Sequence, residues 1–185
     1  MSSHSLTEQL ADVLQQHGWM LATAESCTGG MIAANCTDLS GSSHWFERGF
    51  VTYSNEAKHE MLGVDSALIA AHGAVSEATT AAMAKGALER SEAEVTLSIS
   101  GIAGPGGGSP DKPVGTVWIG WKRRGGYAHA QLFHFDGDRD AVRRCNTDAF
   151  STPAEAALVD ALREAGVPSR SWVAEREGDV VGHIL

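Results

Sequence analysis

The sequence predicts one α/β domain with three α/β/α layers and a mixed sheet. Helix-like and strand-like segments alternate from end to end, with no low-complexity linker and no internal repeat. A length of 185 residues suits one domain with a full core. The 21 glycines are more than average composition gives and are expected at special backbone positions. We place the domain at residues 1–167 and treat 168–185, which has no clear period, as a C-terminal extension of unknown role.

Helical spacing, capping signals and apolar runs divide the first part of the chain. Ser5 and Glu8 form a capping-box pattern, and Ser76 is placed to cap the longest helix. The predicted elements are a helix over 6–17, a strand over 19–24, a helix to about 39, a strand region over 45–53, short helices over 55–62 and 66–71, and a helix over 77–90.

The second part begins with an apolar strand and a glycine-rich loop. The predicted elements are a strand over 95–100, a loop over 101–113, a hairpin of 114–121 with 127–135, and helices over 138–150 and from 153 to Gly166. The hairpin makes the sheet mixed, because the strands before it are joined by helices.

The turn between the first strand and its helix contains Ser26, Cys27 and Thr28, followed by Gly29 and Gly30. Backbone N–H groups and the positive end of the helix dipole meet there, which favours an anion or a developing oxyanion. A simple helix cap with a glycine turn is the commoner explanation of such a pattern.

Three other segments are candidates for chemistry. Lys58 lies near a helix start, where the dipole disfavours its ammonium form, although most such lysines simply face solvent. The amides of the loop over 101–108 could hold a phosphate or ribose, or the loop could be only a connector. Arg139 and Arg143 share a helix face that suits a phosphate, or they pair with nearby acids.

Charge and composition exclude several classes of protein. A net charge of −9 disfavours direct binding of nucleic acid. No signal-peptide core or membrane-length apolar stretch occurs, so we expect a cytoplasmic protein. The three cysteines are unclustered, so no disulfide framework or structural zinc site is expected. His129 and His134 point to opposite faces of a strand, so they are not expected to share a metal ion.

Several long motifs, in this order, resemble the CinA carboxy-terminal domain family of nicotinamide-nucleotide amidases. The motifs are Ala24 to Gly30, Gly41 to Ser43, Trp45 to Lys58, His72 to Ser76, Ser98 to Pro105, Lys112 to Val117, and Gly137 to Arg139 with Val142 and Arg143. The resemblance covers about Leu6 to Ala165. Pro153 and the tail beyond Val167 depart from the family pattern and leave the terminal packing in question.

The resemblance implies hydrolysis of the carboxamide of nicotinamide mononucleotide, without metal or cofactor, in a homodimer. It places the serine nucleophile on Ser26 and the lysine base on Lys58, with Tyr53 as a candidate third member. Amides of Thr28, Gly29 and Gly30 would then hold the oxyanion. Candidates for substrate binding are Gly101, Gly104, Gly106, Arg139 and Arg143.

Two alternatives stay open from the sequence. The first is a non-catalytic interaction module linked to competence or DNA damage, as the family name suggests. The second keeps the fold but uses Cys27 as the nucleophile, although no histidine is placed by spacing to activate it.

Overall fold

The computed structural model describes residues 5–135, 172–176 and 179–184. The helices are α1 (Leu6–His17), α2 (Met31–Asp38), the 3-10 turn η1 (Ser42–His44), α3 (Asn55–Leu62), α4 (Ser66–His72) and α5 (Glu77–Glu89). The strands are β1 (Leu21–Glu25), β2 (Phe46–Val51), β3 (Val95–Gly101), β4 (Thr116–Arg123), β5 (Ala128–His134), β6 (Trp172–Arg176) and β7 (Asp179–Ile184).

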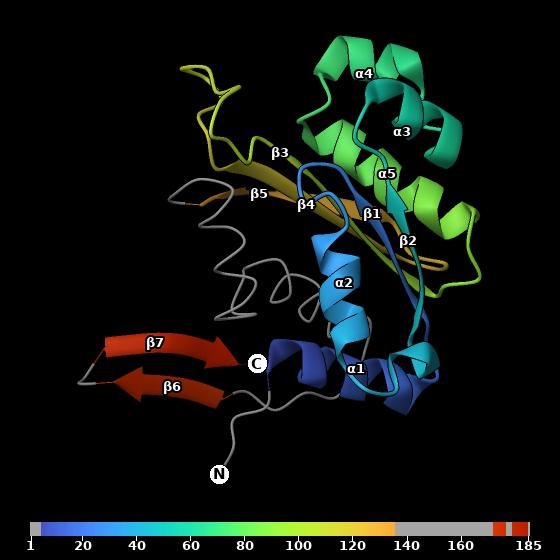
Figure 1. The fold of residues 1–185 in the computed structure, drawn as a ribbon, viewed down its shortest axis with the longest axis vertical. Coiled ribbons are helices and arrows are strands. Elements are labelled where there is room, and N and C mark those ends of the chain that lie inside the picture. The colour runs from blue at the N-terminus through green and yellow to red at the C-terminus, as the bar shows by residue number, and fades with distance from the viewer. Residues whose placement is uncertain (1–4, 136–171, 177–178, 185) are drawn as a thin grey trace.

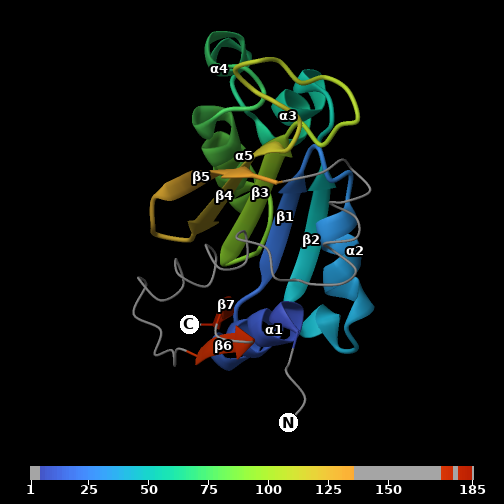
Figure 2. The same ribbon diagram turned by 90° about the vertical axis from the view of Figure 1, so that its left-hand side faces the viewer.

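Five strands form one mixed sheet in the order β2-β1-β3-β4-β5. β1 is parallel to β2 and to β3, whereas β3, β4 and β5 pair in antiparallel fashion. Figures 1 and 2 show α2 on one side of this sheet and α5, with α3 and α4 beyond it, on the other. The mixed sheet between two helical layers confirms the predicted fold class.

Alternation along β3 shows how both faces of the sheet are covered. Its odd-numbered residues Val95, Leu97 and Ile99 belong to a core cluster shared with α1 and α2. The hydroxyls of Thr96 and Ser98 instead donate to the α5 carbonyls of Ala84 and Thr80, at 2.8 and 2.7 Å. Because successive strand residues point to opposite faces, one strand holds both helical layers in place.

Most predicted helix ends are confirmed. Ser5 and Glu8 form the capping box of α1, and the Ser76 side chain accepts a hydrogen bond from Thr79 N at the start of α5. The start of α3 matches the predicted helix over 55–62, with Ser54 as its N-cap and Asn55 as its first helical residue. Lys58 is therefore the fourth helical residue, and its amide donates to Ser54 O.

The tail contains a feature that the sequence pattern did not predict. The segment 168–185 shows no clear period in the sequence, and β6 and β7 pair there as a separate two-stranded antiparallel sheet. The predicted helices over 138–150 and 153–166 lie outside the described residues.

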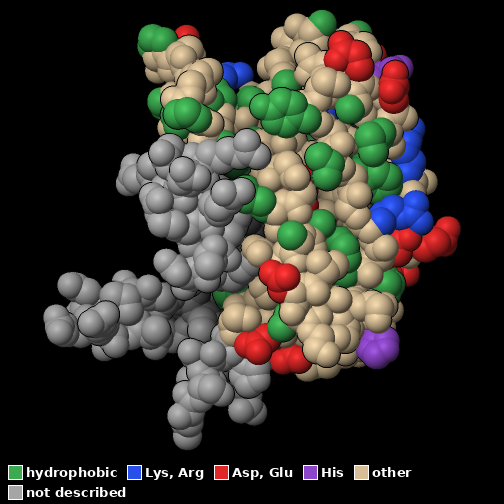
Figure 3. Space-filling model, in the orientation of Figure 1, with side chains coloured by type: hydrophobic (Ala, Val, Ile, Leu, Met, Phe, Trp, Pro, Cys, Tyr) green, Lys and Arg blue, Asp and Glu red, His purple; other side chains and the backbone are tan. Residues whose placement is uncertain are grey.

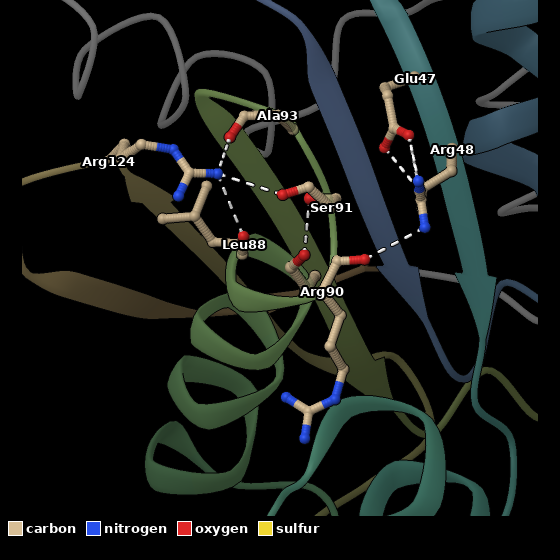
Figure 4. A network of polar contacts seen from close by, with 8 residues as sticks. Glu47, Arg48, Leu88, Arg90, Ser91, Ala93 and Arg124 are labelled. Atoms are coloured by element: carbon tan, nitrogen blue, oxygen red, sulfur yellow. Dashed lines mark hydrogen bonds and ion pairs between the residues drawn. The ribbon is translucent and has the colours of Figure 1, made fainter.

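A polar network ties α5 to the amino end of β3 (Figure 4). Arg124 Nη2 donates to the carbonyls of Leu88, Ser91 and Ala93 at 3.3, 3.2 and 2.7 Å, and Arg48 reaches Arg90 O at 3.1 Å. The carbonyl of Leu88 is in the last turn of α5, where the helix supplies no amide partner, and Ser91 and Ala93 follow the helix, so the guanidinium supplies donors to all three. The network braces the end of β3 opposite the candidate site.

Candidate active site

The carboxyl edge of the parallel strands brings two distant residues together. Ser26 directly follows β1, and Lys58 is in α3, which begins four residues after β2 ends. Because β1 and β2 are parallel neighbours, both segments leave the sheet at the same edge. Lys58 Nζ lies 3.0 Å from Ser26 Oγ, within the hydrogen-bond distance that a nucleophile and a general base require.

Lys58 is buried rather than solvent-facing, with 1% of its surface exposed. Its Nζ also lies 2.9 Å from Thr52 O, 3.1 Å from Tyr53 O and 3.5 Å from Ser54 O. Burial lowers the pKa of Lys58, because the charged ammonium form loses its hydration, and the nearby Cys27 thiol opposes this shift. A buried lysine with a lowered pKa is suited to take a proton from a hydroxyl.

Glu25 is a residue of this site that the sequence reasoning did not single out. Its carboxylate is 1% exposed and accepts from the Thr28 hydroxyl at 2.7 Å. It also accepts from three amides at the start of α2, those of Gly30, Ile32 and Ala33, at 3.0, 3.1 and 2.8 Å. The protein's own carboxylate therefore fills the anion site at this helix start.

The predicted oxyanion donors are consequently not equivalent. The Gly29 amide donates to Ser26 O at 3.2 Å, and the Gly30 amide donates to Glu25. The amides of Cys27 and Thr28 instead hydrogen-bond the Cys27 sulfur, which partly offsets the rise in the pKa of that thiol. These two amides directly follow the Ser26 side chain.

The glycine-rich loop leaves the sheet at the same edge, after β3. At Gly104 the backbone has φ of 78°, which favours glycine, and a Cβ there would lie 2.6 Å from Val114 Cγ1. At Gly101 a Cβ would lie 2.8 Å from Thr116 O, whereas Gly106 has open space around it. Lys112 spans from this loop to the turn before α5, where its Nζ donates to Val75 O at 2.8 Å.

The other predicted site residues are placed differently. The contact between Tyr53 and Lys58 is through the main-chain carbonyl of Tyr53, and Tyr53 is 73% exposed. On the face drawn in Figure 3, hydrophobic side chains are scattered among the backbone and other side chains. Arg139 and Arg143 lie outside the described residues. Within the described part of the chain, no group of three or more His, Cys, Asp or Glu side chains could hold a metal ion.

This chain matches a known family over most of its length. Residues 3–152 match the model described as "CinA C-terminal domain". The chain belongs to the CinA C-terminal domain family.

Named relatives of this CinA C-terminal domain are closely similar in sequence. It is 55% identical over 139 residues to "Nicotinamide-nucleotide amidohydrolase PncC" of Escherichia coli (strain K12), covering 75% of this chain and 84% of that protein. It is 52% identical over 140 residues to the protein of the same name from Enterobacter agglomerans, covering 76% and 85%.

Solved structures show the same fold. The competence/damage inducible protein CihA from Agrobacterium tumefaciens matches with a TM-score of 0.75 and 40% identity, over 86% of this chain and 98% of that chain. No helix in the described residues of this CinA C-terminal domain has the length and hydrophobicity needed to cross a membrane.

Cys27 in this CinA C-terminal domain is a poor candidate for the nucleophile. It is 8% exposed and packs in the core cluster that includes Leu10 and Ile99. Burial raises the pKa of the Cys27 thiol to about 11, with the Glu25 carboxylate adding to the shift. A thiol with that pKa is protonated at neutral pH, and the protonated thiol is not nucleophilic.

Proposed function

We propose that this protein hydrolyses the carboxamide of nicotinamide mononucleotide to nicotinate mononucleotide and ammonia. The observation that carries the proposal is the 3.0 Å contact between Ser26 Oγ and the buried Lys58 Nζ. A serine beside a neutral lysine is a known alternative to the serine and histidine pair in acyl transfer. The amidohydrolase names of relatives that are more than half identical to this chain support the choice of substrate.

In the first half of the reaction, Ser26 Oγ attacks the carboxamide carbon while its proton passes to Lys58 Nζ. The carbonyl oxygen becomes an oxyanion, and we propose that it takes the amides of Cys27 and Thr28, which directly follow Ser26, from the Cys27 sulfur that they hydrogen-bond in this structure. Lys58 then returns the proton to the departing nitrogen, the C–N bond breaks, and ammonia leaves an ester on Ser26.

In the second half, water attacks the ester carbon and gives its proton to Lys58. The C–O bond to Ser26 breaks, the proton returns to Ser26 Oγ, and nicotinate mononucleotide leaves. No group is oxidised or reduced in either half, so the reaction needs no redox cofactor.

The surroundings of Lys58 suit both of its tasks. A neutral amine has two N–H donors, which match the Thr52 and Tyr53 carbonyls at 2.9 and 3.1 Å. Its lone pair is then left to accept the Ser26 hydroxyl. When Lys58 is protonated, the same carbonyls hold the ammonium until it delivers its proton.

The substrate phosphate needs a positive site in a protein whose net charge is −9. We propose the amides of Gly101 at the end of β3 and of Gly104 and Gly106 in the loop that follows, together with Arg139 and Arg143. Lys112 is a cation in the same loop. Its Nζ donates to Val75 O, and it forms no ion pair with any described residue. The homodimer implied by the resemblance stays a prediction.

The test is to incubate wild type and Ser26→Ala with nicotinamide mononucleotide and to measure ammonia and nicotinate mononucleotide together. The proposal expects equal amounts of both products from wild type and neither from the variant. A wild-type protein that binds the mononucleotide but releases no ammonia would contradict catalysis and favour the interaction module.

A further inference from the structure

Glu25 is bound by hydrogen-bond donors on every side of its carboxylate. Oε2 accepts from the Thr28 hydroxyl and from the amides of Gly30 and Ile32, while Oε1 accepts from Ala33 N and, at 3.3 Å, from the Thr23 hydroxyl. A buried carboxylate is costly unless hydrogen bonds replace its hydration, and here they do so. Within the described residues it makes no ion pair with a lysine or arginine.

The same residue connects both halves of the serine and lysine pair. Its side chain holds Thr28 and the start of α2, so it sets the turn that carries Ser26. Its main-chain carbonyl accepts from Thr52 N at 2.7 Å, and Thr52 O in turn holds Lys58 Nζ at 2.9 Å.

We propose that Glu25 is the positioning residue of this active site. By occupying the amides of Gly30, Ile32 and Ala33, its carboxylate fixes the turn at which Ser26 meets Lys58. This inference rests on the proposed function for the reaction that Ser26 carries out, whereas the hydrogen bonds of Glu25 come from the structure itself.

A simple helix cap is the rival explanation, and the two differ in what a substitution changes. Glu25→Gln keeps the shape but replaces one acceptor oxygen by an NH₂ group, which then faces an amide N–H or a hydroxyl. A displacement of about 1 Å in a catalytic group can cost about 10²-fold in rate. If Glu25 positions Ser26, kcat falls while KM changes little; if it only caps α2, stability falls and kcat of the folded protein is kept.

The experiment compares Glu25→Gln with wild type and with Asp65→Asn. Asp65 caps α4 through its side chain, which accepts from Ala67 N at 2.9 Å, so this control makes the same change at a helix start away from Ser26. Each protein is assayed well below its thermal transition for kcat, for KM and for the rate at which a fluorophosphonate labels Ser26.

We expect Glu25→Gln to lose about 10²-fold in kcat and in the labelling rate, with KM within about threefold, and Asp65→Asn to match wild type within about twofold. A folded Glu25→Gln protein with wild-type kcat and labelling would overturn the proposal. If that variant does not fold, Thr28→Val removes only the 2.7 Å bond to the carboxylate. It should lower both rates about tenfold, and unchanged rates in it would also overturn the proposal.

The labelling readout separates this proposal from the choice of substrate. Wild type that is labelled at Ser26 but does not hydrolyse the mononucleotide would refute the proposed function, and the effect of Glu25→Gln on labelling would still decide its positioning function.

Discussion

Replacing Lys58 by methionine tests whether the buried amine is the base. The substitution keeps a long unbranched side chain and removes the group 3.0 Å from Ser26 Oγ. General bases contribute typically about 10²- to 10⁴-fold to a rate, which corresponds to roughly 3 to 5.5 kcal/mol of barrier. We therefore expect kcat of Lys58→Met to fall by at least about 10²-fold, with a smaller change in KM.

The pH dependence gives this prediction its sign. The neutral amine is the active form, and burial lowers the pKa of Lys58 below that of an ordinary lysine. Activity should rise as the pH passes upward through this lowered pKa, then level off before the pH at which an exposed lysine titrates. The same shift means that the unfolded chain binds more protons, so the stability contributed at this position is gained as pH rises and lost as pH falls through the folded-state pKa.

The assay is ammonia release across a pH series at a temperature at which every protein is folded. Loss of the Lys58 donors leaves the buried carbonyl of Thr52 without the Lys58 hydrogen bond, at about 1–3 kcal/mol, and the part-buried carbonyl of Tyr53 at a smaller cost, so the thermal transition of each variant must be measured first. Lys85→Met is the matched control. Lys85 is exposed on α5, and its Nζ forms a surface ion pair with Glu89 Oε1 at 3.8 Å. Wild-type kcat in Lys58→Met, or the same pH profile in both variants, would refute a lysine base.

Further predictions concern neighbouring parts of the fold. Cys27→Ser should keep turnover within a few-fold, because the thiol is buried and protonated; loss of turnover in this folded variant would support Cys27 as the nucleophile. Gly86→Ala should lower the free energy of unfolding by about 1–3 kcal/mol or more, because a Cβ there would lie 2.1 Å from Leu62 O. An unchanged thermal or urea transition would contradict the close packing of α3 on α5. Arg143→Ala should weaken binding of the mononucleotide about ten- to a hundredfold but leave binding of the phosphate-free riboside unchanged, and an equal effect on both ligands would show that Arg143 does not bind the phosphate.

Local signals in the sequence predicted much of the fold. The capping pattern of Ser5 and Glu8, the cap at Ser76 and the apolar run of β3 each act over a few residues, and all three are confirmed. The strands β6 and β7 were not predicted, because short segments such as these carry no clear alternation in the sequence.

The site depended more on tertiary structure. Ser26 and Lys58 are 32 positions apart, and their contact follows from the parallel pairing of β1 with β2, which spacing alone does not reveal. Spacing also suggested a solvent-facing Lys58, whereas it is buried. Glu25 carried no motif of its own, because its importance comes from amides five, seven and eight residues later that only the folded turn brings to it.

The most direct test of the mechanism is to look for the ester on Ser26. Wild-type protein is mixed with nicotinamide mononucleotide, quenched in acid within the first turnover, digested and analysed by mass spectrometry, with Ser26→Ala treated in parallel. We predict an acyl adduct of the nicotinate mononucleotide group on Ser26 of the wild type, and no adduct and no ammonia from the variant. An adduct on Cys27, or ammonia release by Ser26→Ala at the wild-type rate, would contradict the serine and lysine mechanism.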